Sequence, residues 1–313
     1  MTDFGADVSF AQAMDKLVEH YGVLLPEITI RRITERHAQA IHRDSPLVAS
    51  WPQTPGVAVV IALMDGGMVP IVEPDPEQPD RRRGKRLHWK EAKICLAHAQ
   101  DSATLNYGGT LCGDVALAGA QLFDCATRAG FGTTTRVHAV GDGADWIASQ
   151  VEQKFGANGR YLLDFFHVCD YLSAASKAID SDAATAKRWL EQQKLSLKSD
   201  DAQSVIKALS PHLEAADVAD PQAPIRQCHR YLSYRLDQLD YQDAIARKLP
   251  IGSGEIESAH RYVVQQRLKR PGAWWLSSNA DHMLALRLTR ANRQWKSYWA
   301  KRTTDRGLTR AAG

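Results

Sequence analysis

The stretch Gly56-Val-Ala-Val-Val-Ile-Ala-Leu-Met-Asp65-Gly66-Gly67 decides the fold of this chain. A continuous apolar run that ends in a turn signal is typical of a strand buried on both faces in the middle of a sheet. The Asp-Gly-Gly that follows predicts a tight hairpin turn into a second strand, Met68-Val-Pro-Ile-Val. We therefore expect Asp65 to stand at the end of a central strand.

More strands follow this one along the chain. A polar loop over 73–86 leads to a third strand around Trp89-Lys-Glu-Ala-Lys-Ile-Cys-Leu-Ala, and a glycine-containing turn then precedes a helix over 114–129. Arg136-Val-His-Ala-Val-Gly-Asp142-Gly predicts a fourth strand that again ends in Asp-Gly, before a helix over 145–155. Tyr161-Leu-Leu-Asp-Phe-Phe-His-Val predicts a fifth strand.

The rest of the chain has helical periodicity. Residues 8–45 predict two helices separated by Gly22 and Pro26, and the second carries Arg31, Arg32 and Arg36, which is the outline of a helix-turn-helix DNA reader. Residues 170–249 carry helix patterns and no strand pattern. A helix begins after Pro250-Ile-Gly-Ser-Gly and runs to about Lys269, and a last long helix covers about 277–301.

Composition narrows the class of protein. The 313 residues are 44% hydrophobic with a net charge of +3, and the five cysteines are scattered, which argues against a disulfide framework or a zinc site. No apolar run is long enough to span a membrane, and the N-terminus lacks the layout of a signal peptide, so we expect a soluble cytoplasmic protein. Residues 251–313 carry twelve Lys/Arg and four Asp/Glu, with aromatic residues among them, which suits binding to a polyanion such as DNA.

The element order is that of a ribonuclease-H-like mixed α/β sheet: a three-stranded meander, a helix, a parallel strand and helix, another strand and terminal helices. We expect a helical, DNA-binding region at 1–50, the first part of the core at 55–169, a helical insertion at 170–249, and core helices with a basic tail at 250–313. In such a sheet Asp65 and Asp142 would be adjacent at the carboxyl ends of neighbouring strands.

A third acid is expected on a helix beside these two. Glu255 and Glu257 stand at the start of the helix after Gly254, and because they project about 200° apart, only one of them can face the other acids. The pattern alone leaves both open, and an acid at a helix start also complements the helix dipole.

Four ordered blocks resemble the ISKra-type insertion-sequence transposases, relatives of the Mutator-like DDE group. The blocks are Gly141-Asp-Gly-Ala-Asp-Trp-Ile, Leu163-Asp-Phe-Phe-His-Val-Cys-Asp-Tyr-Leu, Ile251-Gly-Ser-Gly-Glu-Ile-Glu-Ser-Ala-His and Val264-Gln-Gln-Arg-Leu-Lys-Arg-Pro-Gly-Ala-Trp-Trp. The resemblance spans about 55–290 and implies that Glu257, which precedes Ser-Ala, is the third acid. It also implies spacings of 77 and 115 residues along the acidic triad, the second lengthened by the insertion.

The resemblance implies a DNA transposase. Asp65, Asp142 and Glu257 would hold Mg²⁺, or Mn²⁺ in its place, for cleavage at the ends of an insertion sequence and strand transfer into target DNA. Terminal inverted repeats and target DNA would be the partners, with self-association on DNA. Relatives often have a longer N-terminal region, which indicates a shortened copy. The alternatives are a metal-dependent nuclease on the same fold and a catalytically inactive, transposase-derived DNA-binding protein.

Further residues have expected auxiliary roles. Asp164 and His167 fall where Mutator-like relatives carry a Cys/Asp-x-x-His motif, and Asp164 is also a rival metal ligand or one half of a buried Asp–His pair. Besides the arginines of the N-terminal region, we expect DNA contacts from Arg267, Lys269, Arg270, Trp274 and Trp275, the cations on phosphates and a tryptophan on an unpaired base. Core packing is the alternative for at least one of the two tryptophans.

Overall fold

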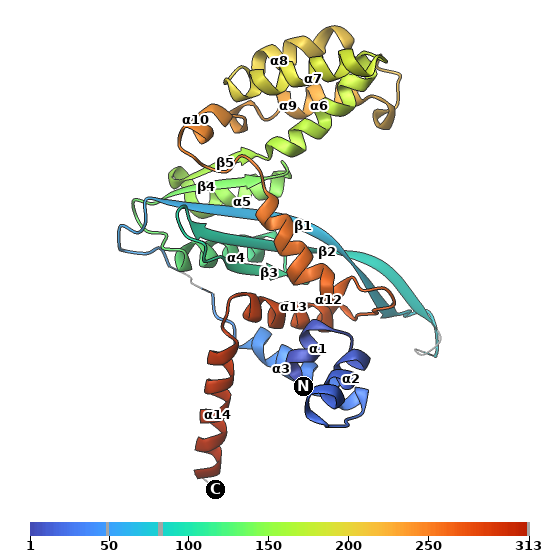
Figure 1. Ribbon diagram of the computed structural model, residues 1–313, viewed down its shortest axis with the longest axis vertical. Helices are drawn as coiled ribbons and strands as arrows, with labels where there is room; N and C mark the ends of the chain where they lie inside the picture. The colour runs from blue at the N-terminus through green and yellow to red at the C-terminus, as the bar shows by residue number, and fades with distance from the viewer. Residues whose placement is uncertain (48–49, 81–83, 312–313) are drawn as a thin grey trace.

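The computed structural model describes residues 1–47, 50–80 and 84–311 and has a mixed α/β architecture (Figure 1). Its described residues form a five-stranded sheet in the order β3-β2-β1-β4-β5, in which β1–β2 and β2–β3 are antiparallel and β1–β4 and β4–β5 are parallel. The strands are β1 (Val59–Pro74), β2 (Lys85–Ala99), β3 (Asn106–Thr110), β4 (Arg136–Gly141) and β5 (Gly159–Leu163).

The hairpin turn expected at Asp65-Gly66-Gly67 is wrong. β1 runs straight through these residues, and they pair in register with Ile94, Lys93 and Ala92 of β2. The glycines serve close packing instead of a turn, because an added Cβ would lie 2.1 Å from the Glu91 side chain at Gly66 and 2.7 Å from the His260 ring at Gly67. The meander therefore consists of β1, β2 and β3. The segment after β2 that was expected to be a glycine-containing turn contains the strand β3. The middle of the polar loop over 73–86 lies outside the described residues.

Helices cover both faces of the sheet. Side chains alternate along β2, so Cys95 and His98 point to opposite faces. Cys95 meets Cys125 of α4 (Val115–Arg128) at 4.0 Å between sulfurs, and α5 (Asp145–Phe155) lies beside α4. His98 meets Glu255 of α11 (Gly254–Ala259) on the other face. That face also carries the π-helix η5 (His260–Gln265), α12 (Gln266–Leu268) and α13 (Ser277–Ala291).

The segment between β5 and α11 consists of helices joined by loops and short 3₁₀ turns, with no strand among its residues. Figure 1 shows these helices stacked at one end of the molecule. They are α6 (Phe165–Ile179), α7 (Ala183–Lys198), α8 (Ala202–Leu209), α9 (Pro224–Ser233) and α10 (Tyr241–Ala246). Their buried apolar side chains, such as Leu172, Leu197 and Leu232, belong to the same hydrophobic core as the sheet. The helical insertion is therefore packed onto the sheet.

The N-terminal helices α1 (Thr2–Asp7), α2 (Phe10–Tyr21) and α3 (Glu27–Arg43) lie at the other end, and α3 packs against α13 (Figure 1). Gly22 ends α2 in the left-handed conformation, φ +64°, as its position predicted. The single last helix expected over 277–301 is wrong, because α13 ends at Ala291 and α14 (Trp295–Ala311) begins after a break in which Arg293 has φ +58°. Among the described residues, no helix is both long and apolar enough to cross a membrane.

Candidate active site: a cavity lined by carboxylates

Four separate segments line a cavity of about 280 Å³ at the edge of the sheet. β1 contributes Asp65, the loop after β4 contributes Asp142, and α11 contributes Glu257. The remaining lining comes from Met64, Asp164, Phe166, His167, Asp170 and Ser253. The structure thus brings together the three acids that lie 77 and 115 residues apart in the sequence.

The parallel pairing of β1 with β4 places two of these acids side by side. The register ends at Leu63↔Val140, so Asp65 and Asp142 each follow two residues after the last pair. Asp142 follows the end of β4, as expected, whereas Asp65 lies inside β1 where β4 diverges from it. Asp65 Oδ1 accepts a hydrogen bond from Gly66 N at 2.7 Å, and Asp142 Oδ1 accepts one from Ala144 N at 2.9 Å. These bonds orient both carboxylates.

The charges around the cavity act on the ionisation of Asp65. Burial raises the pKa of the Asp65 carboxyl above its ordinary value, and the negative charges of Asp142 and Glu257 raise it further. The nearby His260 and the Gly66 amide act in the opposite direction without cancelling the effect. The cavity is therefore a site of concentrated negative potential.

The two glutamates of α11 diverge, as their spacing predicted. Glu255 Oε2 lies 3.1 Å from His98 Nε2, and the bond to His98 lowers the pKa of this carboxyl. Glu255 lines separate hollows against β2 and the Tyr262 side of the helix. Glu257 lines the acidic cavity. The sequence pattern left this choice open, and the packing of α11 makes it.

Asp164 has a structural position. Its carboxylate is buried, with 3% of the residue exposed. Oδ1 accepts from the backbone N–H groups of Phe166 (2.6 Å) and His167 (3.2 Å) and so caps α6. Oδ2 accepts from Ser253 N at 2.8 Å and from the Ser253 hydroxyl. Four donors thus occupy this carboxylate, which ties α6 to the loop that leads into α11. Neither a metal-ligand role nor a pair with the His167 side chain matches these contacts.

His260 is a component of the site to which the sequence reasoning assigned no role. Its buried ring has Nε2 3.2 Å from the carbonyl oxygen and 3.4 Å from Oδ2 of Asp65. The available signal was its spacing, because residues three apart on a helix share a face, so His260 lies on the same side of α11–η5 as Glu257.

His260 also begins the π-helix η5, an irregularity that often marks functional sites. The π-helix carbonyl oxygens of Tyr262 and Val263 accept hydrogen bonds from the buried Arg287 guanidinium, the latter at 2.6 Å. Arg287 also donates to Ala6 O at 2.6 Å, so it links the π-helix to α1. The buried cation therefore stabilises the helical geometry that presents His260 to Asp65.

The helical insertion holds the loop of the second acid. The Tyr231 hydroxyl donates to the carbonyl oxygen of Asp142 at 2.6 Å, and Arg235 donates to Gly143 O at 3.2 Å and pairs with Asp145 at 2.9 Å. Gly143 has φ +88°, and a Cβ there would lie 2.6 Å from the Tyr231 hydroxyl, so only glycine fits. The His167 ring packs edge-on against Tyr231, which stacks on Tyr171 with ring centroids 4.3 Å apart.

The donor set of the cavity fits Mg²⁺, which prefers carboxylate oxygens and retains several waters. Five acidic residues line one small cavity: Asp65, Asp142, Asp164, Asp170 and Glu257. Asp65 carries a raised pKa that a bound cation would offset. In residues 1–47, 50–80 and 84–311, however, no three His, Cys, Asp or Glu side chains are drawn tightly enough together to form a finished metal site. The acids therefore line the cavity without forming a closed, preformed metal site.

The residues expected to contact DNA divide into two groups. Arg31, Arg32 and Arg36 are exposed along α3, Lys269 is exposed after α12, and Trp274 is exposed beside the β1–β2 ribbon with Lys85 Nζ 4.5 Å from its ring centroid. Arg270 is half-buried and donates to Gln12 Oε1 at 2.8 Å. The exposed side chains are accessible to a polyanion.

The expectation for Arg267 is wrong. Only 3% of this residue is exposed, and its guanidinium lies between the rings of Phe10 and Trp275, at 4.6 and 4.8 Å from their centroids. Its Nε donates to Gly5 O at 3.0 Å, and burial lowers its pKa to about 10. Arg267 and Trp275 therefore join α12 to the N-terminal helices, and Trp275 takes the core-packing alternative.

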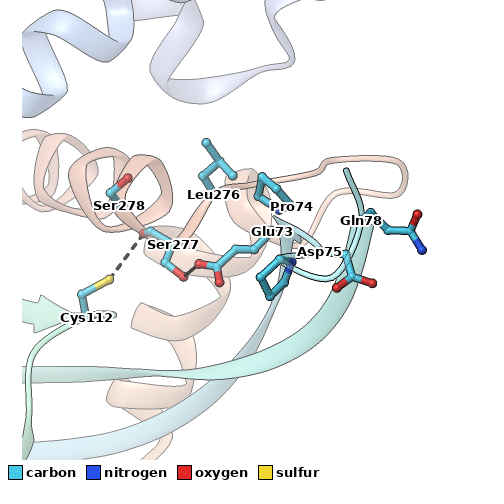
Figure 2. A pocket seen from close by; sticks show the side chains of 9 residues that line it. Glu73, Pro74, Asp75, Gln78, Cys112, Leu276, Ser277 and Ser278 are labelled. Carbon is cyan, nitrogen blue, oxygen red and sulfur yellow. Dashed lines mark hydrogen bonds between the residues drawn. The ribbon is translucent and has the colours of Figure 1, made fainter. Parts of the chain in front are cut away.

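A larger cavity, of about 600 Å³, lies at the distal end of β1 against the start of α13 (Figure 2). Its acids are committed to partners: Glu73 accepts from the Ser277 hydroxyl at 2.5 Å, and Asp75 pairs with Arg86 at 3.1 Å. Cys112 approaches the Ser277 carbonyl oxygen across the same hollow at 3.5 Å. The smaller cavity, where three acids converge, is the stronger candidate for chemistry.

Comparison with known proteins places the chain in a family. The sequence profile of an uncharacterised protein family, UPF0236, matches residues 131–302, which is more than half of the chain. The matched range contains Asp142, Asp164, His167 and Glu257, and Asp65 precedes it. No curated protein matches the chain. The chain belongs to the uncharacterised protein family UPF0236.

Proposed function

We propose that this protein is a DDE transposase of the ISKra type that cleaves and joins DNA with Mg²⁺ on a ribonuclease-H-like core. The observation that carries the proposal is the convergence of Asp65, Asp142 and Glu257 on one cavity from three distant segments. Convergent acids on rigid elements are what phosphoryl-transfer chemistry with divalent ions requires.

The sheet topology supports the proposed core. A central strand that carries the first acid is flanked by an antiparallel strand on one side and a parallel strand, followed by the second acid, on the other. This arrangement is the one expected of a ribonuclease-H-like core and so supports the proposal. The third acid comes from a helix packed on the sheet after the helical insertion, again in the expected order.

Asp65, Asp142 and Glu257 would hold Mg²⁺, or Mn²⁺ in its place. When bound, the ions supply charge stabilisation for the attacking and leaving oxygens of an in-line displacement at phosphorus. In the proposed reaction, water attacks a phosphodiester at the end of the element and releases a 3′-hydroxyl. That hydroxyl then attacks a phosphodiester of the target DNA and displaces its 3′ oxygen, so the number of ester bonds is conserved in the joining step.

The neighbouring residues of this chain orient the acids. His260 lies against both the backbone and the carboxylate of Asp65, and Tyr231 fixes the backbone of Asp142. Asp164 fixes the entry to the helix of Glu257 through Ser253. His167 lines the same cavity, where the scissile phosphate would lie. The proposal gives these residues positioning roles.

The DNA partner is inferred from exposed cations. Lys and Arg side chains bind phosphates without regard to sequence, and those on α3 and after α12 are accessible. Self-association on DNA is part of the proposal because two element ends must be joined together.

The test compares wild-type protein with Asp142→Asn and with the control Asp101→Asn, an exposed acid on the turn after β2. The substrate is a supercoiled plasmid that carries the coding sequence with its genomic flanks. Wild type and Asp101→Asn should nick and join DNA in Mg²⁺, and Asp142→Asn should bind DNA with unchanged affinity and neither nick nor join.

The outcomes separate the proposal from its alternatives. Nicking without joined products indicates a metal-dependent nuclease. DNA binding without nicking by wild-type protein indicates a catalytically inactive DNA-binding protein. Equal loss of binding and cleavage in Asp142→Asn would show that this residue is structural, and would contradict the proposed ligand role.

A further inference from the structure

An exposed aromatic ring stands at the acidic cavity. Phe166 lines the cavity together with the three acids, yet 65% of this residue is exposed. Its neighbour Phe165 is only 4% exposed and packs in the core. Successive residues of a helix project about 100° apart, so the start of α6 turns one phenylalanine inward and the next toward solvent at the mouth of the cavity.

The exposed ring is held in place. The Phe166 N–H donates to Asp164 Oδ1 at 2.6 Å, and the same carboxylate binds Ser253 ahead of the Glu257 helix. The ring lies against Gly252, where an added Cβ would be 2.6 Å from Phe166 Cδ2. Phe165 N donates to Ile251 O at 2.8 Å and adds a further tie between the two segments. The backbone of Phe166 is therefore tied to the segment that leads into the Glu257 helix, which fixes the position of the ring's attachment relative to the cavity.

This placement is distinct from that of the two tryptophans expected to contact a base. Trp275 is buried against Arg267, and Trp274 is exposed beside the β1–β2 ribbon, away from the residues that line the acidic cavity. Phe166 presents its aromatic surface at the cavity where a scissile phosphate would lie.

We propose that Phe166 stacks against an unpaired nucleobase next to the phosphodiester that enters the acidic cavity. The inference rests on the proposed function for its substrate class, and adds a positioning residue to it. Where a nucleotide beside the scissile phosphate leaves the helical stack, an aromatic side chain at the mouth of the cavity replaces the stacking that is lost. Stacking of this kind is sequence-tolerant, because every base has a π-face.

The test measures binding of two probes by fluorescence anisotropy without divalent ions: a labelled oligothymidylate and an abasic oligomer of the same length. The variants are Phe166→Ala, Phe166→Leu and Phe166→Trp. A matched control is Leu195→Ala, which removes an equally exposed apolar side chain from α7. None of these changes touches a buried side chain, so thermal midpoints should stay close to that of wild type.

We expect Phe166→Ala and Phe166→Leu to weaken binding of oligothymidylate by roughly five- to a hundredfold. Their affinity for the abasic oligomer should be unchanged, Phe166→Trp should retain wild-type binding, and Leu195→Ala should match wild type with both probes. Equal loss on both probes, or recovery by leucine, would overturn the stacking role.

The proposed function fails separately from this inference. If the plasmid assay shows no nicking while oligothymidylate binding depends on an aromatic residue at position 166, the stacking role stands and the transposase proposal falls. If wild-type protein and Phe166→Ala nick and join equally well and bind both probes equally, the stacking role falls and the transposase proposal stands.

Discussion

Asp164→Asn discriminates a structural acid from a metal ligand inside one cavity. The asparagine oxygen can still accept from the N–H groups that begin α6, but its amide nitrogen would replace the oxygen that now accepts from Ser253 N. A hydrogen bond to a charged acceptor contributes about 1.5–3 kcal/mol, and a buried N–H left without a partner costs about 1–3 kcal/mol. These two costs describe partly the same lost interaction and are not added in full, so we expect the free energy of unfolding to fall by about 3 kcal/mol.

The assay is thermal unfolding followed with and without Mg²⁺. At roughly 2 °C per kcal/mol for a chain of this size, Asp164→Asn should lower the midpoint by roughly 6 °C. It should keep the upward shift that Mg²⁺ binding gives to wild type. The matched variant is Asp142→Asn, which keeps the acceptor for Ala144 N. Its midpoint in the absence of metal should equal or exceed that of wild type, and its Mg²⁺ response should be lost.

The reasoning is refuted if Asp164→Asn unfolds at the wild-type midpoint and loses the Mg²⁺ response. That result would make Asp164 a ligand, and its four hydrogen bonds incidental. A companion change, Ser253→Ala, removes only the hydroxyl donor. It should therefore cost less than Asp164→Asn in the same assay.

Three further predictions follow from the same contacts. Folding raises the pKa of Asp65, so the stability of the protein falls as pH rises from the ordinary value of 3.8 through the folded pKa. In urea unfolding without metal, Asp65→Asn should be more stable than wild type at pH 7, and this advantage should shrink toward pH 3.8. Lower stability of Asp65→Asn at pH 7 would contradict this. Tyr231→Phe removes the hydrogen bond to the Asp142 backbone and should lower the free energy of unfolding in urea by about 1 kcal/mol. It should slow nicking but keep the stabilisation that Mg²⁺ gives. An unchanged nicking rate would contradict the positioning role. Arg267→Ala should lower the free energy of unfolding by about 2–4 kcal/mol, because the residue is buried. Exposed Lys269→Ala should leave stability unchanged but reduce the salt dependence of DNA binding by about one phosphate contact. Unchanged stability in Arg267→Ala, together with the loss of a phosphate contact, would contradict its assignment to the core.

Asp142 was predictable because strand ends follow simple rules, and the same rule pointed to Asp65 although β1 continues through that residue. An apolar run followed by Asp-Gly indicates where a buried strand meets a crevice, and two such runs on neighbouring parallel strands bring Asp65 and Asp142 together. The choice of Glu257 over Glu255 came from a resemblance in sequence, and the packing of α11 directs Glu255 to His98 and leaves Glu257 at the cavity.

The predictions that were wrong concern residues whose contacts come from segments distant in the sequence. Asp-Gly-Gly is a good hairpin signal by itself, yet β1 stays extended because Glu91 and His260 pack directly over the two glycines. Arg267 belongs to a run of basic residues, a pattern that predicts exposed side chains. It is buried because the N-terminal helices cover it.

The sequence by itself determined most of the helices and strands of this protein, their order along the chain and the acidic residues available for chemistry, because periodicity, turn residues and local motifs are properties of neighbouring positions. The tertiary structure alone decided which acids are free. Asp164 is saturated by donors that include a residue 89 positions away, whereas Asp65 is left with a burial penalty and repelling neighbours. The availability of a carboxylate depends on the donors and charges that folding brings to it, and these come from segments that no local pattern connects.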